Sequence, residues 1–165
     1  IPAHFHAHRA DDIFTAIRLA KEFDIDYVSI HATDGHLIAD ELLEDNARTI
    51  VGPVISERCK PELRNHTIET AGILNKAGVP MCICTDHPVV PEQYLPLSAG
   101  LAVRGGLDRD EALKAITIYP AQITGIADRV GRIEVGKDAD IVIFSGDPLS
   151  VCDTPDMVIV NGTVI

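Results

Sequence analysis

The chain has 165 residues, with 14 Lys and Arg against 25 Asp and Glu, which gives a formal net charge of −11. This acidic balance argues against nucleic acid or an anionic membrane surface as the main partner, because both need clustered basic residues. No run reaches the roughly 18 to 20 apolar residues that a membrane helix needs. The chain begins at Ile1 without an initiator Met, so we expect either a processed N-terminus or part of a longer chain.

The cysteines predict a reducing environment. Cys82 and Cys84 lie in the apolar run over residues 79–85, and on a strand they would share one face. Two buried, reduced thiols fit this pattern better than a zinc site, because a second cysteine pair with matching spacing is absent. We therefore predict a cytoplasmic protein.

Strands and helices alternate over the first 127 residues. Apolar residues at Ile13, Ala16, Ile17 and Ala20 predict an amphipathic helix over residues 12–23, with Asp11 or Asp12 as its N-cap. Strands are predicted at residues 3–5, 26–30, 49–51 and 79–85, and further helices at residues 36–46 and 67–77, the last ended by Gly78. The spacing of about 25 to 30 residues between strands suits βαβ units and a parallel sheet.

The pattern changes after Asp86. An irregular helix bracketed by prolines runs to Arg104, Asp108 caps a clear helix, and residues 120–125 form one more turn. From residue 128 onward the chain reads as strands, at residues 132–135, 140–144 and 157–160. Asn161-Gly162 after the last of these is a strong hairpin signal. We expect one domain over residues 1–127 and a small antiparallel domain over residues 128–165.

Histidines gather at the predicted strand ends. His6 and His8 end the first strand, His31 ends the second, and Asp86 with His87 follows the fourth. Carboxyl ends of parallel strands meet at one edge of a sheet, and imidazoles with a carboxylate are typical ligands of zinc and similar ions. The pattern predicts a metal-assisted hydrolytic site, in which a carboxylate moves the proton of an activated water.

Other catalytic motifs are excluded. Residues 131–138 resemble a phosphate-binding P-loop, but Asp138 stands where Ser or Thr is required, and a strand follows instead of a helix. No Gly-x-Ser-x-Gly elbow of a serine hydrolase is present. Cys59 has no evident base for a nucleophilic role.

Four segments together resemble the metal-dependent amidohydrolase superfamily, and most closely its imidazolonepropionase-like and Xaa-Pro dipeptidase-like members. They are residues 6–13, 30–33, 84–88 and 131–142. The resemblance implies an α/β fold, a (β/α)8 TIM-type barrel with a small β-sandwich. It aligns residues 1–127 with the C-terminal half of that barrel, strands 5–8, and residues 128–165 with the C-terminal strands of the sandwich.

The resemblance also implies the site residues. His6 is similar to the metal ligand of the fifth strand, His31 to that of the sixth, and Asp86 to the aspartate of the eighth. That aspartate takes a proton from metal-bound hydroxide and passes it to the leaving nitrogen. His8 and His87 neighbour these positions and are expected to contact the substrate or to support the ligands.

The implied cofactor is a divalent metal, zinc, with one or two ions in the parent enzyme. The run of His4, His6 and His8 could imitate the family's first-strand His-x-His pair, but the order of the following motifs fits the fifth strand better. That pair and the Lys or Glu of the fourth strand therefore have no counterpart in this sequence. Three of the usual ligands are therefore missing, and we expect the 165-residue chain to hold well below one tightly bound zinc.

Two hypotheses from different classes follow. In the first, the parent enzyme hydrolyses a C–N bond in a small amide, dipeptide or cyclic amide. In the second, this chain is a non-catalytic, truncated half barrel that lacks a complete metal site and forms a homo-oligomer, because half a barrel exposes sheet edges and an apolar inner face. A binding or regulatory protein built on the enzyme scaffold is a third reading. Metal content and turnover distinguish these hypotheses.

Overall fold

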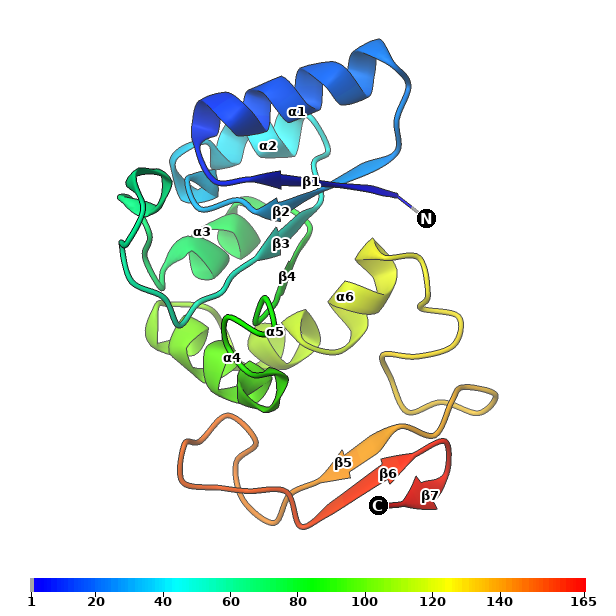
Figure 1. The fold of residues 1–165 in the computed structure, drawn as a ribbon. Coiled ribbons are helices and arrows are strands. Elements are labelled where there is room, and N and C mark those ends of the chain that lie inside the picture. The colour runs from blue at the N-terminus through cyan, green and yellow to red at the C-terminus, as the bar shows by residue number, and fades with distance from the viewer. Residues whose placement is uncertain (1) are drawn as a thin grey trace.

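The computed structural model describes residues 2–165 and contains a parallel sheet that helices cover mainly on one face (Figure 1). Four parallel strands lie side by side in chain order: β1 (Ala3–Ala7), β2 (Tyr27–His31), β3 (Thr49–Val51) and β4 (Met81–Ile83). Helices α1 (Ala10–Glu22), α2 (Ala39–Glu44) and α3 (Thr70–Ala77) connect them, with 3-10 turns η1 (Gly35–Leu37) and η2 (Pro61–Leu63). The predicted α/β fold with a parallel sheet is confirmed.

A helical segment and a second sheet complete the chain. The segment comprises η3 (Glu92–Tyr94), α4 (Leu95–Arg104), α5 (Arg109–Ala115) and α6 (Ile118–Ile123). The antiparallel sheet comprises β5 (Ile141–Ile143), β6 (Met157–Val160) and β7 (Thr163–Val164). In the described part of the chain, no helix has the length and apolar character needed to cross a bilayer.

The second sheet confirms one strand prediction and corrects another. Asn161 (φ 48°) and Gly162 (φ 77°) link β6 to β7, and paired positive φ values are what a tight hairpin turn requires. Residues 132–135 do not form the predicted strand. Ile133 and Val135 are almost fully exposed, so no neighbouring strand or core stabilises an extended ladder there.

The two faces of the parallel sheet are covered unequally. On one face, Ala7, Val51 and Ile83 join the main core with residues of the surrounding helices. On the other, Val28 and Cys82 pack against Ile123 of α6. Figure 1 shows α3 and α6 on opposite sides of β4. His4 and His6 extend this second face across β1, where they are exposed.

The N-terminus of α1 is held by a distant residue. The helix begins at Ala10, and neither Asp11 nor Asp12 caps it, so that prediction was wrong. The buried carboxylate of Asp34 instead accepts the backbone N–H of Ala10 at 3.1 Å and the side-chain amide of Asn65 at 3.0 Å. Asp11 and Asp12 lie in the first turn, where acidic side chains favour the helix dipole.

Two helix ends follow the sequence pattern. Gly78 ends α3 with φ 89°, a left-handed conformation that glycine adopts without strain. Asp108 caps α5, because its side chain accepts the backbone N–H groups of Asp110 and Glu111. Both predictions are confirmed.

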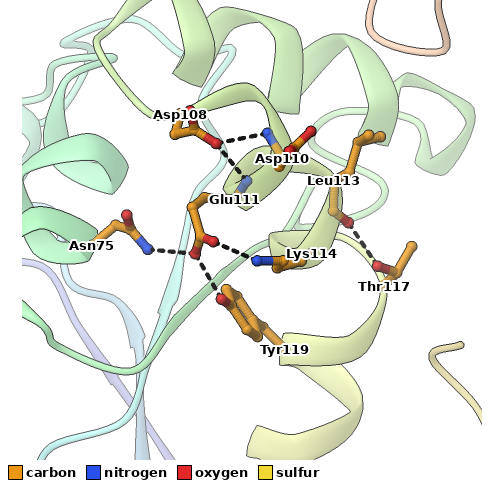
Figure 2. Close-up of polar contacts among 8 residues, drawn as sticks. All are labelled: Asn75, Asp108, Asp110, Glu111, Leu113, Lys114, Thr117 and Tyr119. Carbon is orange, nitrogen blue, oxygen red and sulfur yellow. Dashed lines mark hydrogen bonds and ion pairs between the residues drawn. The ribbon is translucent and has the colours of Figure 1, made fainter.

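One carboxylate links the three helices α3, α5 and α6 (Figure 2). Glu111 of α5 pairs with Lys114 at 2.7 Å and accepts hydrogen bonds from the Tyr119 hydroxyl of α6 at 2.6 Å and the Asn75 amide of α3 at 3.1 Å. These three partners lower the pKa of Glu111 to about 2. The charged form is therefore the one that the folded state stabilises.

We expect Glu111→Gln to lower the free energy of unfolding at pH 7 by about 1–2 kcal/mol, because charge-assisted hydrogen bonds are lost at a partly exposed site. The folded pKa lies below the unfolded value, so this contribution is complete above about pH 4.5 and is lost as the pH falls toward 2. Urea unfolding at pH 7 and pH 3 should show the gap between variant and wild type narrowing in acid. Glu44→Gln, at an exposed helical position, is the control and should change neither value.

Candidate metal centre

Three histidine side chains meet at the carboxyl edge of the parallel sheet. His6 lies in β1, His8 just beyond it, and His31 ends β2. Their nitrogen ligand atoms all lie within 4.8 Å of one another. The rings of His6 and His31 have centroids 4.3 Å apart, and those of His8 and His31 are stacked at 4.6 Å. We call these residues the histidine cluster.

The backbone at the end of β2 brings His31 into this cluster. In the strand register His31 pairs with Ala7, whereas His6 pairs with Ile30. In a regular strand, neighbouring residues point to opposite faces. His31 (φ 74°) and Ala32 (φ 43°) leave the extended region, and His31 lies against His6. Such conformations cost energy and concentrate at functional sites.

Hydrogen bonds orient two of the rings. The Nδ1–H of His31 donates to the Gly52 carbonyl at 2.6 Å, so Nε2 of His31 carries the free lone pair. Nδ1 of His8 lies 2.8 Å from the Thr33 hydroxyl, and Nε2 of His8 lies 3.1 Å from Nε2 of His6. Thr33 is buried. Thr33 belongs to the segment 30–33 that resembles the family, but the resemblance assigned a site role to neither Thr33 nor Gly52.

The environment of His8 and His31 favours the neutral form of these two imidazoles. Burial, and then the nearby His31 and His6 rings, lower the pKa of His8 to about 4. Burial also lowers the pKa of His31, while the Gly52 carbonyl and the charge of Asp86 partly oppose this shift. Neutral imidazoles are the form that binds divalent metals. The donor chemistry of the cluster therefore fits the metal that the sequence predicts.

The acidic residue of the predicted site lies near the cluster and outside it. Asp86 follows β4 with φ 56° and is exposed. It acts electrostatically on His31, but its oxygens do not belong to the group of ligand atoms within 4.8 Å. His87, beside it, is also exposed. The structure thus brings together His6, His8 and His31, and sequence reasoning had treated His8 as a neighbour of the site.

The cluster is accessible, and the cysteines take no part in it. A depression of about 500 Å³ beside β1 and α1 is lined by His6, His8 and Glu62 among others. Cys82 and Cys84 are free thiols, and burial raises their pKa to about 12 and 11. They are therefore protonated at neutral pH and poor metal ligands.

Comparison with known proteins identifies the family. The model of the "Amidohydrolase family" matches residues 3–165. The chain belongs to the amidohydrolase family. It is 42% identical to a solved amidohydrolase from Thermotoga maritima MSB8, with a TM-score of 0.96 over 100% of this chain and 43% of that one. This confirms the resemblance seen in the sequence.

Curated relatives of this amidohydrolase include an imidazolonepropionase from Paracidovorax citrulli. It is 31% identical over 150 residues, which are 87% of this chain and 34% of that enzyme. Amidohydrolase tasK from Hapsidospora irregularis is 28% identical over 96% of this chain and 16% of its own length. The chain therefore spans about a third or less of these relatives. A Xaa-Pro dipeptidase structure at 23% identity, with a TM-score of 0.76, shares the fold.

Proposed function

We propose that this amidohydrolase takes part in the metal-dependent hydrolysis of a C–N bond in a small amide, dipeptide or cyclic amide. The observation that carries the proposal is the histidine cluster at the carboxyl edge of a parallel sheet, where the environment lowers the pKa values of His8 and His31. We propose zinc as the metal, because imidazole ligands with a nearby carboxylate suit that ion.

The proposed roles follow from the positions of the side chains. A divalent metal held here through His6 and His31, with Asp86 as its carboxylate ligand, would polarise the substrate carbonyl and lower the pKa of water. Asp86 is exposed beside His31, so its carboxylate is placed to accept a proton from the attacking water and to deliver it to the leaving nitrogen. His87, next to Asp86, would contact the substrate.

The proposed substrate class rests on the relatives. Several imidazolonepropionases match the chain over part of its length, at up to 44% identity. A cyclic amide such as imidazolonepropionate is accordingly the first substrate to assay, and a dipeptide the second. We further propose that residues 1–127 correspond to strands 5–8 of a TIM-type barrel and residues 128–165 to sandwich strands. The four parallel strands and the TM-score of 0.96 over 43% of a longer solved chain support this.

Metal removal tests the proposal. We expect any hydrolysis of these substrates to disappear after treatment with a chelator and to return when zinc is added, because the metal supplies the electrophile. Turnover should be followed directly by product formation, with the metal content measured by elemental analysis in the same samples. Turnover that survives complete metal removal would exclude the proposed chemistry.

One observation favours the second candidate, a self-associating module without turnover. Within residues 2–165, β1 pairs with β2 alone and β4 with β3 alone, and unpaired parallel edges favour association with further strands. This candidate predicts a stable homo-oligomer by light scattering, together with no hydrolysis after zinc addition. A monomer at high concentration would contradict it.

A further inference from the structure

We propose that His8 is itself a metal ligand, and that His6, His8 and His31 of this chain together bind one divalent transition-metal ion, with Thr33 as the residue that positions His8. The proposal rests on the proposed function only in placing a metal at this edge of the sheet. It goes further, because it assigns His8 a direct bond to the metal ion and makes metal binding independent of Asp86.

The separation of the ring nitrogens fits ligation. Zinc–nitrogen bonds of about 2.0–2.1 Å at a tetrahedral angle place two ligand nitrogens about 3.3 Å apart. Nε2 of His6 and Nε2 of His8 are 3.1 Å apart, and the ligand atoms of all three rings lie within 4.8 Å of one another. His31 is buried and held in place, so small rotations of the exposed His6 and half-buried His8 side chains would bring the three nitrogens to one ion.

Groups outside the cluster engage Nδ1 on two of the rings, whereas Nε2 of His8 contacts another ligand atom of the cluster, Nε2 of His6. The Gly52 carbonyl engages Nδ1 of His31, and the Thr33 hydroxyl engages Nδ1 of His8. The two rings are stacked with an interplanar angle of 16°, so they are held in a common orientation. A hydrogen bond to the distal nitrogen is how proteins orient metal-bound imidazoles. The Thr33 hydroxyl therefore orients the His8 ring, as the Gly52 carbonyl orients the His31 ring.

The donor set also indicates which ions bind. Three imidazoles without a carboxylate favour zinc, copper, nickel and cobalt over magnesium and calcium, which prefer oxygen ligands. Three protein ligands with an open fourth position form a recurrent catalytic pattern. This set differs from the one inferred by sequence resemblance, in which His6 and His31 are the imidazole ligands and Asp86 completes the site.

The 165-residue chain, stripped of metal, should be titrated with Co²⁺ alone and then with Zn²⁺ as competitor. The readouts are the visible absorption of bound Co²⁺ and the dissociation constant. We expect a stoichiometry of one ion per chain, in contrast to the occupancy well below one that the sequence resemblance alone predicts. His8→Ala should weaken binding about 100-fold and change the Co²⁺ spectrum, whereas His4→Ala should change neither, because exposed His4 in the same strand lies outside the cluster.

Thr33 is tested by a matched pair of substitutions. Thr33→Val removes the hydroxyl at nearly constant volume and should weaken Co²⁺ binding about 10-fold, while Thr33→Ser should restore it. Circular dichroism checks that each variant is folded. Wild-type affinity in folded His8→Ala would overturn the proposal, as would the absence of Co²⁺ binding in the wild-type chain.

The proposed function can fail separately. If His6→Ala and His31→Ala abolish metal binding while His8→Ala does not, the metal site stands and the role of His8 is wrong. If all three substitutions abolish binding but the loaded protein hydrolyses none of the substrates, the ligand assignment stands and the proposed reaction is wrong.

Discussion

Asp86→Asn is expected to reduce turnover about 1000-fold in any preparation of the chain that hydrolyses one of the proposed substrates. An amide cannot accept the proton of the attacking water, and loss of general acid–base catalysis typically costs about 10²–10⁴-fold. The fold should persist, because Asp86 is exposed after β4. Steady-state kinetics of zinc-loaded wild type and variant measure the effect.

Asp86 is proposed both as a metal ligand and as the group that transfers the proton, and measurement of the metal content distinguishes these two roles. With the imidazoles of the cluster in place, the variant should retain its zinc by elemental analysis while losing turnover. Asp40→Asn, at an exposed position in α2, is the control for removal of a surface charge and should keep full activity. An Asp86→Asn protein with wild-type kcat would remove Asp86 from the mechanism.

Gly52→Ala is expected to destabilise the protein by about 3 kcal/mol and to lower Tm by roughly 10 °C. A Cβ atom at this position would overlap the backbone carbonyl oxygen of Cys84, which follows β4. Gly52 also has φ +142°, a backbone conformation that strains any residue with a Cβ atom. The resulting shift would also move the carbonyl that holds Nδ1 of His31. Thermal unfolding measures the stability, and Co²⁺ affinity measures the effect on the site.

A second glycine separates the two causes of this effect. Gly136 also has a positive φ, of +93°, but a Cβ there would meet no atom within 4 Å. Gly136→Ala therefore reports the backbone cost alone and should be the milder change, with unchanged metal affinity. Equal destabilisation by the two substitutions would show that the contact with Cys84 has no effect.

Features with local causes could be predicted from the sequence. The apolar spacing in α1, the glycine that ends α3 and the side-chain cap of α5 each depend on residues within a few positions of one another. The hairpin at Asn161-Gly162 belongs to the same class. Each of these signals acts through backbone geometry or one short hydrogen bond, so one stretch of sequence contains the whole cause.

Features with distant causes could not be predicted in this way. Asp34, 24 residues from Ala10, holds the start of α1, whereas the neighbouring sequence favours Asp11 or Asp12 as the cap. Residues 132–135 alternate like a strand but lack a partner strand. Alternating apolar and polar residues show which face a strand would bury. The strand forms only where a neighbouring strand or core packs against that face.

The candidate site likewise combines features that could be predicted from nearby residues with features that depend on distant ones. Strand-end positions of His6, His31 and Asp86 were read from the chain, because parallel strands share one carboxyl edge. The membership of His8 in the cluster depends on the left-handed backbone at His31 and on the hydroxyl of Thr33. Neither is visible until the second strand is placed beside the first.

The buried carboxylate of Asp34 has a consequence for the motions of the site. Its oxygens accept from Ala10, after β1, and from Asn65, after β3, while its own backbone N–H donates to the carbonyl of His8. Connections that follow three different strands are thereby joined at one residue. They are expected to open as one cooperative unit, so that amide hydrogen exchange in the three segments is correlated.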